Sequence, residues 1–473
     1  MADQQSSFDV LILGGGNGGY SCAFRAVDLG LSVAIIERDK VGGTCLHRGC
    51  IPTKALLHAA DLMDEFRSAG EFGIKVAEPD YDWSKVQAFK ESVVGRMYKG
   101  LSGLVRKNKI ELVEGTGTLV DNKTIAVQTT DGDRVLKADK AIVVSTGSLP
   151  RDLPFLPSDG DKVHNSTHGL EAGDVPASVV VIGGNYIGLE FASVYRSFGS
   201  EVTVVEMLPK IAPAEDDDIS AALLKLLERR GINFRTGTSV VGAETSGAGV
   251  ELHIEKDGTK ETLKADRVLV AIGRGPNSEG IGLEDVGVKT ERGFIVVDPG
   301  FRTSVEGIYA IGDVIHVPEA NWPHPQLAHV AFIEGQKTAE RIAGQNPVPV
   351  DYKNIPHVIY CQPEVAAVGL TEQKAKEAGY DVVTARYPFS ALARALMLGG
   401  GQGFVKTVAE KGGAVLGVHI VGARASDLIT EAQLATSWEA YPEELAELIH
   451  PHPTLSEGIG ETFLHIAGKP LHG

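Results

Sequence analysis

The chain has 473 residues, enough for about three domains of ordinary size. Its formal net charge of −17, from 45 basic and 62 acidic residues, argues against a general nucleic-acid-binding protein. No apolar run reaches the roughly 20 residues that span a bilayer, and the N-terminal segment has no signal-peptide core, so we expect a cytoplasmic protein with no membrane segment.

The first predicted unit is a strand, a glycine-rich turn, a helix and a second strand. An apolar run over residues 8–13 leads into Gly14, Gly16 and Gly19, which fit the pattern G-x-G-x-x-G. These glycines permit a tight turn, a close approach to a pyrophosphate and close helix packing. The second strand ends at Glu37, where a carboxylate can accept from a ribose hydroxyl. The alternative is a tight turn without a ligand, but the strand, helix and acid together favour dinucleotide binding.

Directly after this unit, residues 42–57 hold two cysteines five positions apart, Cys45 and Cys50. Four cysteines in so long a chain do not make a secreted disulfide framework, so a close pair indicates catalysis or metal binding. A structural zinc site would need a second nearby pair of ligands, which the sequence lacks. We prefer a redox-active disulfide, because Cys50 lies near the start of a helix predicted over residues 51–67 and near Lys54, and both features favour the thiolate.

The strand–turn–helix–strand pattern recurs in the middle of the chain. An apolar strand leads into Gly183, Gly184 and Gly188, and the next strand ends at Glu206. The spacing from first glycine to acid is 23 in both copies, since 37 − 14 and 206 − 183 are equal. We interpret this as a duplicated unit for a second dinucleotide, and Glu206 favours NAD over NADP because a carboxylate repels a 2′-phosphate. Asn185 replaces the second glycine, and its side chain is expected to crowd the pyrophosphate.

Further strands are predicted to end in glycine-containing turns, and such strand ends lie near ligands in open α/β sheets. The strands are residues 141–144, 267–272 and 307–311, and the turns are Thr146-Gly147-Ser148, Gly273-Arg274 and Gly312-Asp313. From about residue 349 the pattern changes to alternating segments, such as residues 404–408. They predict an antiparallel sheet with helices, a separate α+β domain.

His452, near the C-terminus, is the best candidate for a general base. A dithiol substrate must lose a proton before it attacks a disulfide, and an imidazole is suited to this near neutral pH. Glu457 is the candidate to hold the ring in the right tautomer. Taken alone, a histidine between two prolines is more often a structural loop residue, so this assignment depends on the rest of the chain.

Residues 42–57 resemble the redox segment of the flavin-dependent disulfide reductases, above all the dihydrolipoamide dehydrogenase pattern GGTCLNxGCIPSKALL. The resemblance covers essentially the whole chain and continues in the motifs TGS, AIGRGPN, YAIGDV, QLAHVA and HPHPTLSE, in the family's order. It implies an α/β fold with two Rossmann-like dinucleotide-binding domains and a C-terminal α+β dimerisation domain. The implied domains are residues 1–148 for FAD and the redox disulfide, 149–275 for NAD, 276–348 as a central domain with the second part of the FAD site, and 349–473 for the interface.

The resemblance also implies the role of individual residues. The implied catalytic set is Cys45, Cys50, Lys54, Glu190, His452 and Glu457. In it, Cys45 exchanges with the substrate, Cys50 lies against the flavin, and the base acts on the disulfide of the opposite subunit of a homodimer. The implied FAD contacts are Gly14, Gly16, Gly19, Glu37, Gly43, Thr44, Lys54, Gly117, Thr146, Gly147, Ser148, Gly312, Asp313, Gln326, Leu327, Ala328 and His329. The implied NAD contacts are Gly183, Gly184, Gly188, Glu190, Glu206, Gly273 and Arg274.

The implied reaction is oxidation of protein-bound dihydrolipoamide by NAD⁺, as the E3 component of 2-oxo acid dehydrogenase complexes. Its partner would be their lipoylated acyltransferase domain, and we expect no nucleic-acid or membrane partner. The runner-up is an NAD(P)H-dependent reductase of a low-molecular-weight disulfide, which Tyr186 favours and Glu206 disfavours. A mercuric reductase would carry another cysteine pair near the C-terminus. A quinone reductase or transhydrogenase on this scaffold would tend to lack the pair, and a purely structural component would not need it.

Some residues depart from the family pattern. His47 and Arg48 stand between the cysteines in place of small or amide residues, and Asn185 has replaced a glycine. Residues 316–325 form a longer segment than the family's, directly before the QLAHVA motif. These departures concern substrate identity and nucleotide kinetics rather than the class of enzyme.

Overall fold

The computed structural model describes residues 6–320 and 324–472. The chain divides into two compact units, each assembled from separated stretches. Unit 1 comprises Met1–Pro52, Ala88–Pro150 and Arg274–Tyr352, and unit 2 comprises Thr53–Gln87, Arg151–Gly273 and Lys353–Gly473. The division into four domains remains a prediction. In segment 316–325, which differs from the family pattern, residues 321–323 lie outside the described residues. No helix within residues 6–320 or 324–472 has the length and apolar character needed to cross a bilayer.

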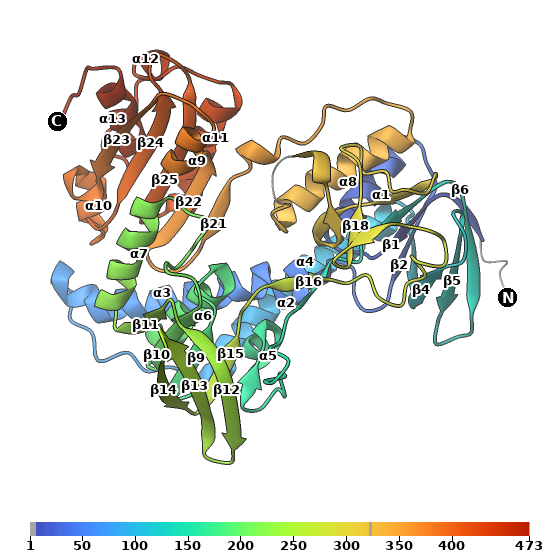
Figure 1. The fold of residues 1–473 in the computed structure, drawn as a ribbon, viewed down its shortest axis with the longest axis horizontal. Helices are drawn as coiled ribbons and strands as arrows, with labels where there is room; N and C mark the ends of the chain where they lie inside the picture. Colours follow the sequence, from blue (N-terminus) through green and yellow to red (C-terminus); the bar gives the residue numbers. More distant parts are fainter. Residues whose placement is uncertain (1–5, 321–323, 473) are drawn as a thin grey trace. The chain divides into compact units, whose positions relative to one another are not determined.

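Unit 1 is built on a sheet with the strand order β3-β2-β1-β6-β5-β4, and β19 also pairs with β6 (Figure 1). The strands that pair in parallel are β1 (Ser7–Leu13), β2 (Val33–Glu37), β3 (Glu111–Glu114), β6 (Arg134–Val144) and β19 (Ile308–Ala310). The antiparallel additions are β4 (Thr116–Leu119) and β5 (Thr124–Gln128). Residues 10–13 of β1 are almost completely buried, which explains their continuous apolar run.

Helices α1 (Asn17–Asp28) and α8 (Ala328–Ile342) lie side by side in unit 1 (Figure 1). Their backbones approach closely at Gly335, where an added Cβ would stand 2.4 Å from the carbonyl oxygen of Gly18. An ion pair of 2.7 Å between Arg25 and Glu340 joins the same two helices. A larger residue at Gly335 would therefore force them apart.

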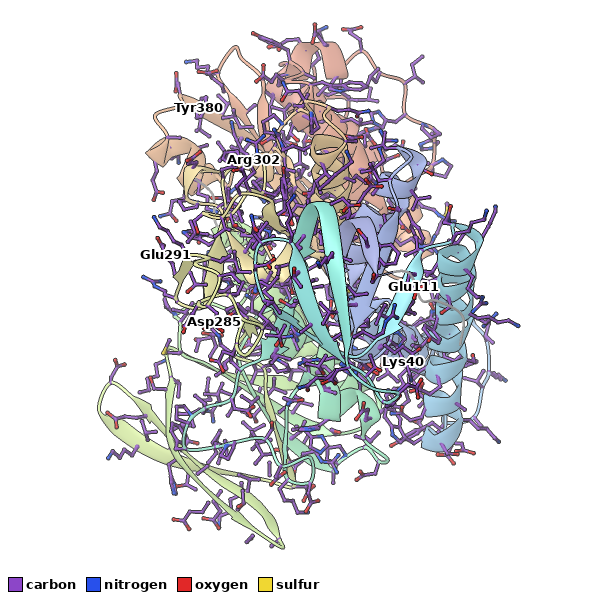
Figure 2. All side chains as sticks on the ribbon, turned by 90° about the vertical axis from the view of Figure 1, so that its right-hand side faces the viewer. Lys40, Glu111, Asp285, Glu291, Arg302 and Tyr380 are labelled. Carbon is purple, nitrogen blue, oxygen red and sulfur yellow. The ribbon has the colours of Figure 1, made fainter. Side chains whose placement is uncertain are left out.

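Unit 1 also holds shorter elements around this sheet. They are α2 (Gly43–Arg48), β7 (Ser148–Pro150), β16 (Arg274–Pro276), β17 (Thr290–Glu291), β18 (Phe294–Val296), β20 (Ile315–His316) and the 3₁₀ helices η2 (Gly312–Val314) and η3 (Pro318–Ala320). β16 pairs with β7, and β18 pairs with β17 and β20. Glu291, labelled in Figure 2, lies 3.6 Å from His316 of β20. Two long helices, α3 (Cys50–Ser68) and α4 (Trp83–Lys107), pass from one unit into the other.

Unit 2 contains the second parallel sheet, in the order β11-β10-β9-β15-β8. Its strands are β8 (Val163–His164), β9 (Ser178–Ile182), β10 (Glu201–Glu206), β11 (Ile232–Thr236) and β15 (Arg267–Val270). Its helices are α5 (Ser166–Glu171), α6 (Tyr186–Ser197) and α7 (Asp217–Arg229). A three-stranded antiparallel sheet precedes β15, formed by β12 (Ser239–Ser246), β13 (Gly249–Lys256) and β14 (Thr259–Ala265).

The C-terminal part of unit 2 is an antiparallel sheet in the order β21-β22-β25-β24-β23. Its strands are β21 (His357–Ile359), β22 (Glu364–Gly369), β23 (Val382–Pro388), β24 (Phe404–Glu410) and β25 (Val415–Gly422). Its helices are α9 (Glu372–Glu377), α10 (Ala393–Met397), α11 (Ala425–Ser437), α12 (Pro442–Leu445) and α13 (Glu457–Ile466). The remaining 3₁₀ helices are η1 (Ala69–Phe72), η4 (Tyr352–Asn354) and η5 (Phe389–Ala391).

A hydrophobic cluster in unit 2 joins helices α3 and α6 to strand β10. Leu56, Leu189 and Val204 each keep at most 1% of their surface exposed there. Burial of such a side chain contributes about 1.5–3 kcal/mol. Leu56 belongs to the segment that carries the cysteines, so this cluster holds one end of that segment to the second βαβ unit.

The sequence-based elements agree closely with the structure. The strand expected over residues 178–182 has the observed bounds, and the helix expected over 51–67 is one residue longer at each end. The strand expected over 267–272 ends earlier, at Val270, because the chain turns at Gly273 with a φ of +115°. The short helix α2 around Cys45 was not predicted. The predicted α/β architecture with a C-terminal α+β part is confirmed.

Candidate active site

In the first glycine loop, between β1 and α1, close contacts leave no room for a side chain at two of the three glycines. Gly14 has a φ of +104°, and an added Cβ would meet the Ser145 carbonyl oxygen at 2.3 Å. At Gly19 an added Cβ would meet the Gly14 carbonyl oxygen at 2.0 Å. Gly16 differs, because the nearest atom to an added Cβ is 4.0 Å away. The first and third glycines are therefore needed for packing, and the second leaves an open backbone face at the start of α1, where a phosphate can bind.

Glu37 closes this loop from the end of β2. Its Oε2 accepts from the Gly15 N–H at 2.7 Å, and its Oε1 accepts from the Asp39 N–H at 2.9 Å. Burial raises the pKa of Glu37 above its usual value, although these N–H groups and nearby arginines act in the opposite direction. The carboxylate is thus fixed beside the loop with lone pairs left for ribose hydroxyls.

The cysteine segment is docked on the same glycine loop. The Gly42 N–H donates to the Gly15 carbonyl at 2.8 Å, and an added Cβ at Gly43 would lie 2.7 Å from the Cα of Gly16. Helix α2 then carries Cys45, and α3 begins at Cys50. Both cysteines are half-buried. The predicted redox pair therefore lies beside the predicted FAD phosphate loop, within one unit.

The environment of the cysteines shows in two neighbouring groups. Burial, together with the negative charge of Cys45, raises the pKa of Tyr20 to about 12. Burial lowers the pKa of Arg274, while Asp313 and Cys50 oppose that shift. Tyr20 and Arg274 therefore lie within electrostatic reach of Cys45 and Cys50 respectively, and the sequence indicated neither relation.

His47 and Arg48 tie α2 to the loop that precedes it. The His47 Nε2–H donates to the Val41 carbonyl at 3.0 Å, and its ring meets Tyr98 edge-on at 5.3 Å. Arg48 forms an ion pair with Asp39. Lys40, labelled in Figure 2, lies in the same loop and accepts from the Gly43 N–H at 3.4 Å. His47 and Arg48, which differ from the family pattern, thus hold α2 against the residues that surround it.

Arg274 joins two turns that the sequence assigned to FAD. Its Nε donates to Ser148 Oγ at 2.7 Å, and Ser148 Oγ donates to Asp313 Oδ2 at 2.6 Å. Gln326 Nε2 donates to the Asp313 carbonyl at 3.1 Å. Arg274 was assigned to NAD, but its contacts in unit 1 are with residues assigned to FAD.

Other residues predicted to contact FAD surround these groups. Gly117 is pressed against Leu13, since an added Cβ would lie 2.6 Å from its Cδ1. Leu327 is the N-cap of α8, and Ala328 and His329 begin the helix, so its N–H groups suit an acceptor. Thr146 Oγ1 is buried with no hydrogen-bond partner among the described residues. An orphaned hydroxyl, an open glycine face and a fixed carboxylate fit FAD. Thr44 and Gly147 lie in the same unit, and Lys54 lies in unit 2.

The second glycine loop, in unit 2, repeats the first. Added Cβ atoms at Gly183 and Gly188 would meet carbonyl oxygens at 2.4 and 1.9 Å. Glu206 accepts from the Gly184 N–H at 2.6 Å and from the Leu208 N–H at 2.7 Å. These are the same two bonds, at the same sequence offsets, that Glu37 accepts. The duplication inferred from spacing therefore extends to individual hydrogen bonds.

Asn185 occupies the N-cap of α6 without capping it. Its side chain makes no cap hydrogen bond, and its Oδ1 is buried without a partner among the described residues. Gly273 has a φ of +115° and no atom within 4 Å of an added Cβ. A second dinucleotide fits this loop, with the Asn185 amide as a polar group for it.

In unit 2, Lys54 and Glu190 form the predicted ion pair through both carboxylate oxygens. Lys54 Nζ lies 2.9 Å from each carboxylate oxygen of Glu190. The Tyr360 N–H donates to Glu190 Oε1 at 3.0 Å, and its ring lies under Lys54 at 4.6 Å. Tyr360 holds both charged groups and was not singled out from the sequence.

Tyr186 belongs to a buried polar network. Its hydroxyl donates to Glu215 Oε1 at 3.1 Å and lies 3.2 Å from His357 Nδ1. Burial and the charge of Glu215 raise the pKa of Tyr186. Although burial opposes it, Glu215 also raises the pKa of His357. Tyr186, the residue that favours the runner-up function, is therefore fixed by the hydrogen bond of its hydroxyl.

His452 and Glu457 meet as predicted from the sequence. His452 Nδ1 lies 2.7 Å from Glu457 Oε1, and the His452 side chain is 74% exposed. Burial pushes the pKa of Glu457 up, but the Thr454 N–H and His452 outweigh it and keep it below its usual value. Glu457 is also the first residue of α13, where a carboxylate is favoured. The pair thus presents an oriented imidazole on an exposed loop.

His450 has a different setting, two residues away. Its Nε2 lies 2.7 Å from Glu431 Oε1, and only 14% of its side chain is exposed. An added Cβ at Gly460 would lie 2.6 Å from its ring, so the ring is packed against α13. The hydrogen bond with Glu431 raises the pKa of His450. His450 therefore fits a structural role better than His452 does.

Within residues 6–320 and 324–472, no group of three or more His, Cys, Asp or Glu side chains is arranged to hold a metal ion.

Comparison with known proteins identifies the family. Residues 8–335 match the family "Pyridine nucleotide-disulphide oxidoreductase", and residues 355–463 match its dimerisation domain. The chain is 43% identical to dihydrolipoyl dehydrogenase of Bacillus subtilis over 99% of both chains, and 42% identical to that of Zymomonas mobilis over 100% of both. It also resembles the crystal structure of LpdA from Mycobacterium tuberculosis, with a TM-score of 0.89, 27% identity and coverage of 98% of this chain and 100% of that one.

These likenesses agree with the predicted fold class, enzyme class and cofactors. FAD and NAD are the cofactors of the family's dihydrolipoyl dehydrogenases, and the dimerisation domain accords with a homodimer. The chain belongs to the pyridine nucleotide-disulphide oxidoreductase family, as a flavoprotein disulfide oxidoreductase of the dihydrolipoyl dehydrogenase type.

Proposed function

We propose that this chain oxidises protein-bound dihydrolipoamide with NAD⁺, as the E3 component of 2-oxo acid dehydrogenase complexes. The observation that carries the proposal is the docking of the cysteine segment on the first glycine loop, through the Gly42 N–H and the Gly15 carbonyl. This contact supports a redox role for the cysteine pair beside a flavin-binding loop. A lipoylated acyltransferase domain is the proposed partner, and the cytoplasm the proposed compartment.

His452 is proposed to start the reaction. Because Glu457 holds its Nδ1, its Nε2 takes a proton from one substrate thiol. That thiolate attacks the Sγ of Cys45 and breaks the Cys45–Cys50 bond. The second substrate thiol then displaces Cys45, so that the substrate leaves as a cyclic disulfide and both cysteines are reduced.

Cys50 is proposed to hold the resulting negative charge. Arg274 lies within its electrostatic reach, and a nearby cation favours a thiolate. When bound, FAD and NAD supply the electron-carrier chemistry, and the protein supplies position and electrostatics. Lys54 and Glu190 are proposed to keep a fixed charge pair beside the flavin.

The proposed active unit is a homodimer whose subunits share each active site. Residues 355–463, which match the dimerisation domain, contain His452 and Glu457. The exposed imidazole of His452 suits a base that serves the cysteine pair of the partner subunit.

Steady-state assays with purified protein test this function. Dihydrolipoamide and a lipoylated domain should each reduce NAD⁺ rapidly, and NADP⁺ should be a poor substitute because Glu206 is fixed at the second loop. The second candidate, a low-molecular-weight disulfide reductase, predicts turnover of NADPH with a small disulfide instead. That result, without dihydrolipoamide oxidation, would overturn the proposal.

A further inference from the structure

Glu334 is a completely buried carboxylate on α8 in unit 1. Its Oε2 accepts from the Gly312 N–H at 2.7 Å, and its Oε1 accepts from the Tyr352 hydroxyl at 2.6 Å. Its Oε1 also lies 2.8 Å from His324 Nε2. Nearby His324 and these two donors keep the pKa of Glu334 below its usual value, although burial acts against them. A buried ionised carboxylate needs such partners, because an unpaired charge is costly in the interior.

His324 shares the buried setting but has an unused atom. Only 6% of its side chain is exposed, and its Nε2–H points to Glu334. Its Nδ1 is buried without a hydrogen-bond partner among the described residues. A polar atom buried in this way is destabilising if it remains unpaired. The ring is therefore oriented by a carboxylate on one side and lacks a protein partner on the other.

The charge on His324 is set by its acidic neighbours. Burial lowers the pKa of His324, but Glu334 and Asp313 outweigh burial and raise it. In the protonated ring both nitrogens are donors, so Nδ1 offers a hydrogen to an acceptor. Among the described residues, Glu334 contacts the His324 ring, the Tyr352 ring lies 5.7 Å from it, and Asp313 acts on its charge.

Asp313 relates His324 electrostatically to the residues around the cysteine pair. Asp313 accepts from Ser148, Ser148 accepts from Arg274, and the charge of Cys50 acts on Arg274. In the proposed function electrons pass between Cys50 and the flavin, which would put the flavin's reactive ring near the same polar groups. The buried His324 thus belongs to the unit that also holds Cys50, Asp313 and Arg274.

We propose that His324 donates a hydrogen bond from Nδ1 to FAD and stabilises the negative charge of the reduced flavin. Two electrons and one proton convert the oxidised ring into an anionic reduced ring, and His324 keeps its own proton throughout. The inference rests on the proposed function in placing the flavin beside Cys50. His324 was not among the FAD contacts predicted from the sequence, and it lies in the segment 316–325 that departs from the family pattern.

Two substitutions separate this role from a purely structural one. His324→Gln places an amide near the former Nε2 and keeps a donor for Glu334, but it leaves nothing at Nδ1. His324→Asn places its amide near Nδ1 and gives up the bond to Glu334. The measurement is the flavin midpoint potential of each holoprotein, read from loss of flavin absorbance in an anaerobic dye-coupled titration. It needs neither dihydrolipoamide nor NAD⁺, so its failure is distinct from failure of the proposed function.

The Gln variant should have a flavin that is about tenfold harder to reduce, which is about 30 mV for a two-electron couple. The Asn variant should remain closer to the wild type in potential, while losing more thermal stability. An unchanged potential in the Gln variant, or equal shifts in both variants, would overturn the proposal. His472→Gln is the matched control, because His472 also pairs with a glutamate, Glu461 at 2.8 Å, but is 66% exposed.

The pH dependence of the flavin potential gives a second test, for the wild type and the Gln variant. Because the pKa of His324 is raised, the donor is present below that pKa and is lost as the pH rises through it. The gap between wild type and the Gln variant should therefore be largest at low pH and close at high pH. If neither variant retains FAD, the wild-type potential should still bend at the raised pKa of His324, and a straight line across that range would overturn the proposal.

Discussion

The two glycine loops of this chain share one geometry and differ in what they anchor. Each loop has glycines at which a Cβ would clash with the backbone. Each also ends at a glutamate that accepts two backbone N–H groups. The likeness continues beyond the glutamate. The Gly42 N–H donates to the Gly15 carbonyl, and the Ala212 N–H donates to the equivalent Gly184 carbonyl at 2.7 Å. Both donors have positive φ angles, +112° and +44°.

After this shared anchor the two segments diverge. The first continues into α2 with Cys45, and the second continues into the buried acid Glu215, which binds Tyr186 and His357. The scaffold thus offers the same backbone site twice, and the side chains that follow decide the use. One copy is followed by the cysteine pair, while the other is followed by a buried polar network around Glu215.

The largest expected effect comes from changing Cys50, which only the segment after the first glycine loop carries. Cys50→Ser should lower dihydrolipoamide oxidation by roughly a thousandfold or more, because the disulfide can no longer form. FAD binding should persist, since the segment is docked on the glycine loop through the Gly42 N–H and the Gly15 carbonyl. Stopped-flow reduction of the flavin measures this. The control is Cys361→Ala, at a buried thiol bound to the Pro363 carbonyl, and substantial activity in Cys50→Ser would contradict the comparison.

The base should follow in size of effect. His452→Gln should slow dithiol oxidation by about 10²- to 10⁴-fold, because Nε2 no longer accepts a proton. His450→Gln should cost less than about tenfold, since His450 is packed and bonded to Glu431. The pH profile of NAD⁺ reduction measures both variants. Equal losses would remove His452 as the base.

The matched glutamates test whether the two loops are functional equivalents. Glu206→Gln should raise the KM for NAD⁺ by about ten- to a hundredfold, because charge-assisted hydrogen bonds contribute about 1.5–3 kcal/mol. Glu37→Gln should instead speed the release of FAD and leave that KM unchanged. Steady-state kinetics and FAD release during dialysis separate the two. A change of both quantities in both variants would mean that the loops are not independent.

Tyr186→Phe should have the smallest effect on activity. It removes one donor from Glu215, so unit 2 should lose about 1–3 kcal/mol of stability in urea unfolding. Turnover with NAD⁺ should change by less than about twofold, because the hydroxyl is bonded to Glu215 and has no proposed role in the reaction. A strong loss of turnover at unchanged stability would show that the hydroxyl acts on the nucleotide.

The parts predictable from sequence are those written in short, local patterns. Glycine and glutamate spacing was enough for both βαβ units, because a βα turn constrains residues that are close in sequence. The bond between Arg274 and Ser148 spans 126 positions, and local patterns do not encode such contacts. Tyr360 and Glu334 were missed for the same reason. Helix α2 was missed because six residues between glycines carry little periodicity.

Anaerobic titration of the holoprotein with dihydrolipoamide tests the central claim most directly. A long-wavelength band from a Cys50 thiolate against the flavin should appear after one equivalent, and NAD⁺ added next should be reduced. The account requires both signals in the wild type and neither in Cys50→Ser. Flavin that stays unchanged with dihydrolipoamide but is reduced by NADPH would contradict it.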